Sequence, residues 1–496
     1  MENFNLNFNF DWEFKIEGET EWKKISIPHD WLIGDVKNLY KNSVGLYRKF
    51  FELKNFSSRE KIFLRFDGVY QDCDLHVNGK KVGEWKHGYT AFEFEITEFL
   101  REEQNEILVT VRHESPNSRW YSGAGIFRDV TLIRKNAAHF KRDGIYVTPY
   151  KDEKNNWKAK IETEVEADEQ EYEIKYFFAE LPCNDGIYKP IELLIPRVWD
   201  INDPVCYMLK CELLVNGEVV DTAHTRFGFR EINFTPEKFF LNGRHVPIRG
   251  VCQHHDLGGL GAAFHKDAAR RQLQILREMG VNAIRTAHNP PAAAFMELCD
   301  EMGFLVMSEF TDMWLRPKTN FDYARFFDEW VERDVSAWIR RDRNCPSIIM
   351  WSVGNEIYDT HADPELGLRT LKRLICEVKK HDPNNHAFPT LCSNYMAWEP
   401  TQKCADEIKL IGYNYAERLY SEHKSAHPDW IIYGGETAST VQSRGVYHFP
   451  FAKPILCEDD EQCSSLGNST TSWGARSTEA VIRDHENNLG QFIWTG

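Results

Sequence analysis

The chain has 496 residues, which is enough for roughly three domains of 100–200 residues each. Its apolar content of 42% supports ordinary hydrophobic cores, and its net charge of −16 argues against a phosphate backbone as a partner. No run of about 18 apolar residues and no signal-peptide pattern is present, and the twelve cysteines lack Cys-x-x-Cys spacing. We therefore expect a cytoplasmic protein with reduced thiols that binds neither nucleic acid nor membrane.

Residues 1–137 are predicted to form a β-sandwich of the jelly-roll type, because short alternating runs recur along them. Asn78-Gly79 lies between two such runs and predicts a type I′ hairpin, whose two central residues both need positive φ. The stretch Arg119–Asp129 is too rich in glycine and aromatic residues for a strand. It predicts a shaped loop, either a domain contact, which composition favours, or part of a binding site.

Residues 138–233 are predicted to form a second, smaller unit, an immunoglobulin-like β-sandwich. Apolar and polar residues alternate over 159–165, and Asn216-Gly217 supplies a second hairpin turn. We find no chemistry in this part of the sequence, so a spacer that orients its neighbours is the expected role.

Residues 234–496 alternate strands with helices, which predicts a (β/α)8 TIM barrel. Asp363-Pro364 is expected to start one helix as its N-cap and first residue. A helix expected over Lys266–Met279 carries Ala269, Leu273, Leu276 and Met279 on one face. The expected strands are Val246–Val251, Val281–Ile284, Phe304–Met307, the start of Ser347–Ile357, His386–Thr390, Lys409–Gly412, Ile431–Gly434 and Gln491–Trp494.

Polar residues lie at or just past the carboxyl ends of these expected strands. In a TIM barrel those ends meet at one face, where catalytic residues sit. One such residue could be explained as a helix cap, but ten on one face predict a catalytic site. They are His254, Arg285, His288, Asn289, Glu309, Asn355, Glu356, Tyr415, Glu436 and Trp494.

Two carboxylates on the fourth and seventh strands, Glu356 and Glu436, suit the cleavage of a glycosidic bond. One carboxyl group protonates the leaving oxygen, and the other attacks C1 or activates water. The sequence contains no HExxH zinc motif and no GxSxG nucleophile elbow. We predict no metal or cofactor, although the cluster His254-His255-Asp256 could bind a divalent ion.

The motifs of the chain resemble those of family 2 glycoside hydrolases, the family of bacterial β-galactosidases and β-glucuronidases. The resemblance covers essentially all residues. Trp120–Arg128 resembles the first-domain signature of the family, and Phe227–Arg230 resembles its junction into the barrel. Arg285–Pro291 and Trp351–Glu356 resemble its barrel signatures.

This resemblance implies a retaining hydrolase in which Glu356 is the general acid/base and Glu436 is the nucleophile. It also implies that Asn355 hydrogen-bonds the 2-hydroxyl of the sugar. The remaining residues implied to bind substrate are His254, His288, Tyr415 and Trp494 around the sugar, with Asn42 and Asn117 reaching in from the first domain.

Two features depart from the family pattern. The third strand ends in Ser308-Glu309-Phe310, where many relatives carry Asp-Glu-Ala, so its hydrogen bonding is expected to differ. The sequence also ends at Gly496, directly after the eighth strand. We expect a truncated barrel that leaves the outer face of that strand uncovered around Phe492 and is at most weakly active.

The segments Gln491–Gly496 and Arg444–Pro450 resemble β-galactosidases, which predicts an exo-acting β-galactosidase with a small carbohydrate substrate. The alternative is a β-glucuronidase or β-galacturonidase, whose charged sugar needs a cationic pocket. A non-catalytic carbohydrate-binding relative is a remote alternative, because it predicts the loss of a catalytic carboxylate and both are present. We also expect a homo-oligomer.

Overall fold

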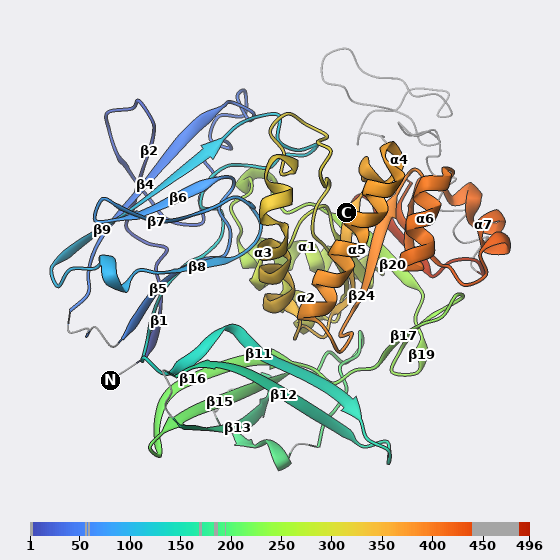
Figure 1. The fold of residues 1–496 in the computed structure, drawn as a ribbon, viewed down its shortest axis with the longest axis horizontal. Helices are drawn as coiled ribbons and strands as arrows, with labels where there is room; N and C mark the ends of the chain where they lie inside the picture. The colour runs from blue at the N-terminus through green and yellow to red at the C-terminus, as the bar shows by residue number, and fades with distance from the viewer. Residues whose placement is uncertain are drawn as a thin grey trace.

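The computed structural model describes residues 3–54, 57, 60–167, 171–182, 187–193, 195–438 and 486–496. Two antiparallel β-sandwiches and a closed barrel of eight strands make up the fold (Figure 1). The first sandwich lies beside the barrel, and the second lies below both in this view. The predicted fold class of jelly-roll sandwich, immunoglobulin-like sandwich and TIM barrel is confirmed. Among the described residues, no helix is both long and apolar enough to cross a membrane.

The first sandwich packs a four-stranded sheet on a six-stranded sheet around a core that includes Trp12, Tyr47 and Val77. Asn78-Gly79 joins β6 to β7 with φ angles of 51° and 78°, which confirms the predicted turn. In sheet order, the strands are β1 (Phe4–Asn7), β10 (Val130–Lys135), β5 (Lys61–Phe66) and β8 (Phe92–Glu95), then β3 (Lys23–Ile25), β2 (Trp12–Ile16), β4 (Ser43–Glu52), β9 (Gln104–His113), β6 (Cys73–Val77) and β7 (Lys80–Trp85).

The second sandwich has a two-stranded and a four-stranded sheet around Phe140, Leu209 and Leu213. Asn216-Gly217 forms the turn between β15 and β16, again with both φ angles positive. The strands are β11 (His139–Lys151) and β12 (Trp157–Glu166), then β14 (Lys189–Pro190), β13 (Tyr172–Glu180), β15 (Tyr207–Val215) and β16 (Glu218–Phe227). A small sheet leads into the barrel and consists of β17 (Ile232–Phe234), β18 (Phe239–Leu241) and β19 (Arg244–His245). The apolar residues of this sheet pack with the hydrophobic cluster of the barrel strands.

All eight expected barrel strands are present, but most extend further toward their carboxyl ends than predicted. Glu309, Asn355 and Glu436 therefore belong to strands, because the parallel ladder continues through them to the neighbouring strands. The strands are β20 (Ile248–Gln253), β21 (Ala283–Thr286), β22 (Leu305–Glu309), β23 (Ile348–Asn355), β24 (Phe388–Ser393), β25 (Leu410–Asn414), β26 (Ile431–Ala438) and β27 (Gly490–Trp494).

The expectation for Phe492 is wrong. Its side chain is fully buried and belongs to the cluster inside the barrel, where it contacts Tyr433 edge-on. β27 pairs with β20 and places Gly250 opposite Phe492. A Cβ on Gly250 would lie 2.3 Å from the phenyl ring, so only glycine fits there. The pleat, with its period of two, turns Phe492 inward rather than outward.

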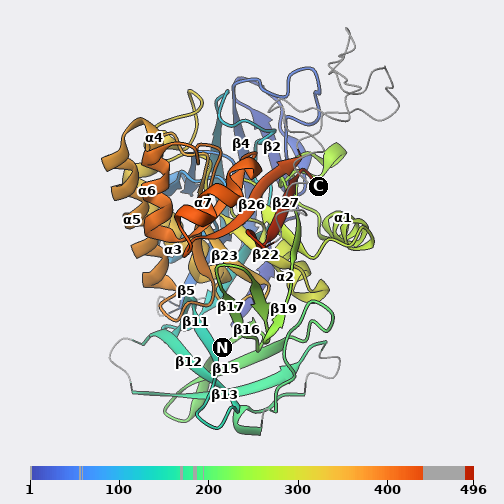
Figure 2. The same ribbon diagram turned by 90° about the vertical axis from the view of Figure 1, so that its right-hand side faces the viewer.

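Helices cover the outside of the barrel (Figure 2). Asp363 caps α5 by accepting a hydrogen bond from the Leu366 amide, as predicted. Ala269, Leu273 and Leu276 of α1 are buried, but Met279 is exposed because the helix ends at Glu278. The helices are α1 (Lys266–Glu278), α2 (Ala293–Met302), α3 (Ala324–Asp342), α4 (Asp359–Ala362), α5 (Pro364–His381), α6 (Glu399–Ile408) and α7 (Tyr420–Ala426).

Candidate active site

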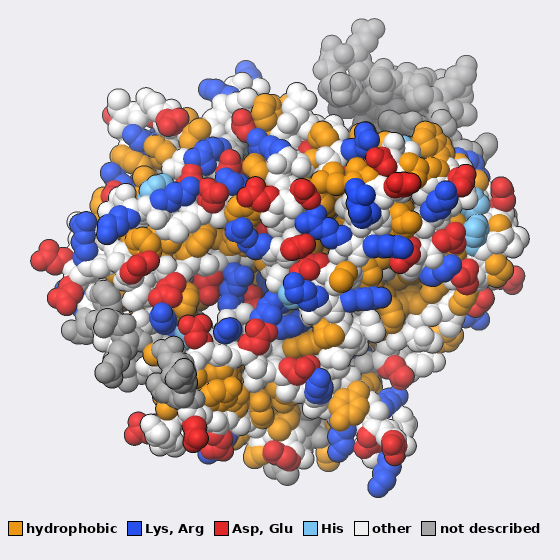
Figure 3. Space-filling view, viewed as in Figure 1, with side chains coloured by type: hydrophobic (Ala, Val, Ile, Leu, Met, Phe, Trp, Pro, Cys, Tyr) orange, Lys and Arg blue, Asp and Glu red, His pale blue; other side chains and the backbone are white. Residues whose placement is uncertain are grey.

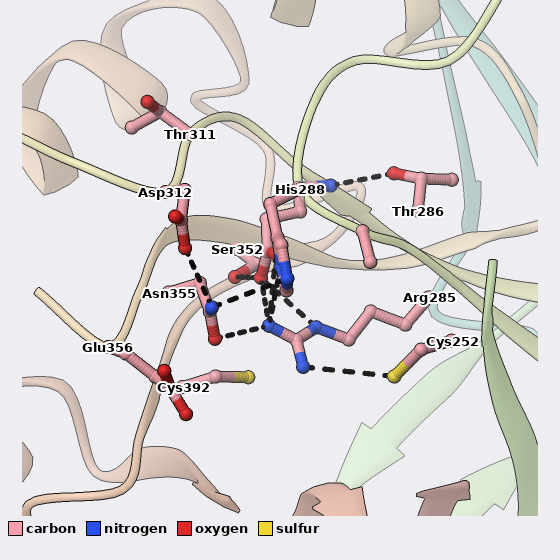
Figure 4. A network of polar contacts seen from close by, with 12 residues as sticks. Cys252, Arg285, Thr286, His288, Thr311, Asp312, Ser352, Asn355, Glu356 and Cys392 are labelled. Carbon is pink, nitrogen blue, oxygen red and sulfur yellow. Dashed lines mark hydrogen bonds and ion pairs between the residues drawn. The ribbon is translucent and has the colours of Figure 1, made fainter. Parts of the chain in front are cut away.

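Arg285, on β21, is the centre of the polar network at the carboxyl ends of the barrel strands (Figure 4). Its side chain is fully buried. The guanidinium donates to Glu436 Oε1 at 2.9 Å and to Asn355 Oδ1 at 2.7 Å. It also donates to both carboxylate oxygens of Glu309, at 2.9–3.1 Å. A buried guanidinium is stable only with such partners, so Arg285 fixes three side chains from three strands.

Glu309, on β22, is the permanent counter-ion of this network. It accepts hydrogen bonds from Ser352 Oγ at 2.6 Å and contacts His288 Nδ1 at 2.6 Å. Burial alone would raise the pKa of Glu309, but Arg285 and His288 together hold it below its usual value. The carboxylate therefore stays ionised and supports its neighbours, with none of its oxygens directed to solvent.

Ser308 does not take part in the network. Successive side chains of a strand point to opposite faces, so Ser308 faces outward when Glu309 faces inward. Its hydroxyl accepts a hydrogen bond from Trp338 Nε1 of α3 at 2.8 Å. Ser308 therefore contributes to the contact between β22 and α3.

Glu436, on β26, faces the same centre from the opposite side of the barrel. It is buried and accepts a hydrogen bond from Tyr415 Oη at 2.8 Å in addition to that from Arg285. Burial raises the pKa of Glu436, the Arg285 guanidinium opposes this, and the Glu356 carboxylate adds to it. The two glutamates thus lie close enough to influence each other electrostatically.

Glu356 directly follows β23 and adopts a positive φ of 46°. Its carboxylate accepts hydrogen bonds from Asn414 Nδ2 at 3.1 Å and from Arg119 Nη1 at 3.1 Å. Asn414 and Tyr415 are consecutive residues, so one segment holds both Glu356 and Glu436. Tyr415 also has a positive φ, of 52°, and this turn lets both neighbouring side chains reach the site.

Asn355 connects the centre of the network to its rim. Its amide Nδ2 donates to Asp312 Oδ1 at 2.8 Å. Asp312 also accepts from Lys318 Nζ at 2.8 Å and pairs with Arg119 at 2.7 Å. Burial alone would raise the pKa of Asp312, but Lys318, together with His288 and Arg119, holds it well below its usual value. Asn355 is therefore held in one orientation by charged groups on both sides.

Four aromatic or imidazole rings surround this network. His288 and Trp494 stack with an interplanar angle of 11° and ring centres 5.3 Å apart. His254 packs edge-on against Trp494 at 5.1 Å, and Trp120 of the first sandwich stacks on His254 at 5.6 Å. Burial, together with His288, lowers the pKa of His254 to about 4, so His254 is neutral at physiological pH.

The two asparagines expected from the first sandwich have different surroundings. Asn117 is buried and lines a cavity together with Trp120, His288 and Asp312. Asn42 is exposed, and its side-chain oxygen accepts a hydrogen bond from the Ser115 amide. Asn42 thus supports the loop that presents Asn117.

The side chains of His254 and His255 do not converge on a common metal position. His254 Nδ1 hydrogen-bonds the Ala287 carbonyl at 2.9 Å, whereas His255 Nε2 hydrogen-bonds the Ser122 carbonyl at 3.1 Å. Across the described ranges, no group of three or more His, Cys, Asp or Glu side chains is arranged to hold a metal ion.

Sequence reasoning missed Arg119, Asp312, Lys318 and Asn414. Arg119 comes from the glycine-rich loop, which composition favoured as a domain contact; the structure shows that the contact reaches Glu356 itself. Asp312 and Asn414 follow the apolar parts of β22 and β25, so the rule that found Glu309 could have found them. Lys318 carried no such signal, because it lies nine residues past its strand. The segment Arg444–Pro450 lies outside the described residues.

Three family models match successive parts of the chain. The model described as glycosyl hydrolases family 2, sugar binding domain, matches residues 9–136. The glycosyl hydrolases family 2 model matches residues 129–230, and the family 2 TIM barrel domain matches residues 232–432.

Individual relatives cover the whole chain. A protein of Bacteroides ovatus named as a β-galactosidase is 32% identical over 99% of this chain and 67% of its own length. A putative β-glucuronidase of Formosa agariphila is 29% identical over 100% of this chain, which spans 52% of that relative. The crystal structure of a β-glycosidase from Bacteroides vulgatus superposes with a TM-score of 0.85 at 29% identity, over 99% of this chain and 70% of that one. The chain therefore belongs to family 2 of the glycosyl hydrolases.

Proposed function

We propose that this protein is a retaining, exo-acting β-glycoside hydrolase with Glu436 as nucleophile and Glu356 as general acid/base. The observation that carries the proposal is that the two carboxylates have different hydrogen-bond partners. Glu436 lies inside the barrel between a guanidinium and a phenol, whereas Glu356 lies at the rim beside Asn414 and Arg119. Two carboxyl groups with different surroundings suit the two roles of this chemistry.

In the first step, Glu436 attacks C1 while Glu356 protonates the oxygen of the leaving group. Burial raises the pKa of Glu436 and Arg285 opposes this rise, while Tyr415 Oη donates a hydrogen bond that orients one of its oxygens. In the second step, Glu356 takes a proton from water as the water oxygen attacks C1, and the bond between C1 and Glu436 breaks and releases the carboxylate. Two displacements at C1 give net retention of configuration.

The remaining residues are proposed to bind the sugar. The amide of Asn355, held by Asp312 and Arg285, is the group for the 2-hydroxyl. The stacked pair His288 and Trp494 offers an apolar face with His254 at its edge. Asn117 is proposed to contribute from the first sandwich.

Replacing Glu356 by alanine tests the assignment of the two roles. Glu356→Ala should retain the first step for aryl glycosides with good leaving groups, and azide should then restore turnover and give a β-glycosyl azide. NMR of the product identifies its configuration. Glu399→Ala, at an exposed glutamate of α6, is the matched control and should behave like the wild type without azide. An α-configured azide would contradict the proposal.

We propose a neutral β-galactoside as the substrate. The segment Gln491–Gly496 supports this, as does the relative named as a β-galactosidase. Arg119 and Lys318 both pair with Asp312, and Arg119 also pairs with Glu356, so these two cations already have carboxylate partners within the described part of the site. This favours a neutral sugar over a uronic acid.

The test is a comparison of kcat/KM for aryl β-galactosides and aryl β-glucuronides. We expect a preference for the galactoside of at least about tenfold, which corresponds to about 1.4 kcal/mol of transition-state discrimination. The reverse preference would establish the alternative, a β-glucuronidase or β-galacturonidase. Binding of sugar without any turnover would establish the non-catalytic alternative.

A further inference from the structure

Four rings form an aromatic cluster at the rim of the barrel: Tyr358, His361, Tyr395 and Trp398. His361 lies between the others, with ring centres 3.8 Å from Tyr395, 5.2 Å from Trp398 and 5.8 Å from Tyr358. Trp398 is 51% exposed and Tyr358 is 36% exposed. Apolar side chains gather over α4, at the upper right of Figure 3, with acidic and basic side chains beside them.

The sequence places this aromatic cluster next to Glu356. Tyr358 follows Glu356 by two residues and precedes α4, which carries His361. Tyr395 follows β24, the strand next to β23, and Trp398 is the N-cap of α6. Adjacent strands of a parallel barrel end side by side, so their loops meet on one side of the mouth.

Contacts continue from Glu356 to the aromatic cluster. Arg119 bonds Glu356 and Asp312, and Asp312 pairs with Lys318 at 2.8 Å. The Lys318 ammonium in turn lies 5.7 Å from the centre of the Tyr358 ring. Burial and the Glu356 carboxylate both act to raise the pKa of Tyr395, which places this ring within electrostatic range of the carboxylate.

Core packing alone does not account for these exposed rings. A fully buried tryptophan or tyrosine withdraws a large apolar area from water, and here half of Trp398 remains in contact with solvent. Large exposed apolar side chains that gather beside a polar site are typical of ligand-binding surfaces. The apolar C–H face of a pyranose ring is a ligand that such rings bind through the hydrophobic effect.

We propose that the aromatic cluster binds the leaving group, and that this group is itself a pyranose. The inference rests on the proposed function, because a general acid at Glu356 must contact the oxygen between the cleaved sugar and its leaving group. The leaving group then lies on the Glu356 side of the mouth, away from the buried Glu436. That side carries Tyr358, Tyr395 and Trp398, so the natural substrate is a β-linked di- or oligosaccharide.

The experiment compares two substrates in wild type and Trp398→Ala. A β-galactosyl disaccharide has a leaving pyranose, whereas β-galactosyl fluoride has the same glycone and no ring to stack. We expect kcat/KM for the disaccharide to fall at least about tenfold more than that for the fluoride. Trp398→Phe keeps a ring and should recover most of the loss. Tyr172→Ala, at an exposed ring on β13 of the second sandwich, should match the wild type with both substrates.

Equal losses with the two substrates, or no loss with either, would overturn the inference. A wild-type chain that cleaves neither substrate would contradict the proposed function instead. In that case the affinity for the disaccharide is measured by calorimetry in both chains. Weaker binding by Trp398→Ala would still support the aromatic cluster as a sugar site, and equal affinity would overturn it.

Discussion

The inner and the outer part of the site are built in different ways. The inner part contains Arg285, Glu309 and Glu436, which lie within barrel strands and are buried. The outer part contains Glu356, just past its strand, together with Arg119 from another domain. The barrel strands and the turns that follow them fix the inner part, whereas the outer part also depends on how the first sandwich packs on the barrel. Changes in the two parts should therefore have different consequences.

The inner part should give the largest effect. Glu436→Gln keeps the shape of the side chain but removes the nucleophile, and turnover should fall by about 10⁴-fold or more. The thermal midpoint should change little, because Arg285 keeps its ion pair with Glu309. Steady-state kinetics and calorimetry measure the two quantities, with Glu399→Gln as the control. Residual turnover above about one percent would contradict the assignment of Glu436.

The outer part should respond less strongly. Arg119→Ala removes a hydrogen bond from Glu356 and an ion pair from Asp312, so we expect kcat/KM to fall about 10- to 100-fold through misplacement of Glu356. Arg119→Lys should recover part of the loss. Arg244→Ala, at an exposed ion pair with Asp200 far from the barrel mouth, is the control. Full activity of Arg119→Ala would show that the outer part does not need the first sandwich.

The smallest effect is expected where the first sandwich contacts α3. Asp334 is buried there beside Thr90 and Tyr323, and burial raises its pKa to about 7. The folded state therefore binds a proton that the unfolded state releases near pH 4. The associated stability is fully present below that pH and is lost as pH rises through 7.

Asp334→Asn should remove this dependence. As pH rises from 5 to 8, the free energy of unfolding of the variant should increase by on the order of 1–2 kcal/mol relative to that of wild type. This is less than the full linkage, because some solvation accompanies ionisation of Asp334 in the wild type. Thermal unfolding across this range measures the difference, and turnover should not change. A constant difference between the two proteins at all pH values would contradict the raised pKa.

The sequence predicted the inner part of the site better than the outer part. Apolar runs followed by polar residues located the eight strands and residues such as Glu309 and Glu436, because strand ends converge by topology alone. Arg119 required knowledge of how two domains pack, which no local pattern contains. Phe492 was placed on the wrong face, because Phe492, Ile493 and Trp494 are consecutive apolar residues, and a run without alternation does not show which face is buried.

The turn at Asn414-Tyr415 requires a fixed number of residues. Each of its two side chains holds one of the glutamates, and they reach the same side only because the backbone turns at Tyr415. A left-handed conformation at a bulky residue costs about 1–3 kcal/mol and persists only when its surroundings enforce it. A single residue inserted between the two would leave every functional group in the chain yet separate the supports of the two carboxylates. Insertions and deletions here should therefore reduce activity more than substitution of either side chain does.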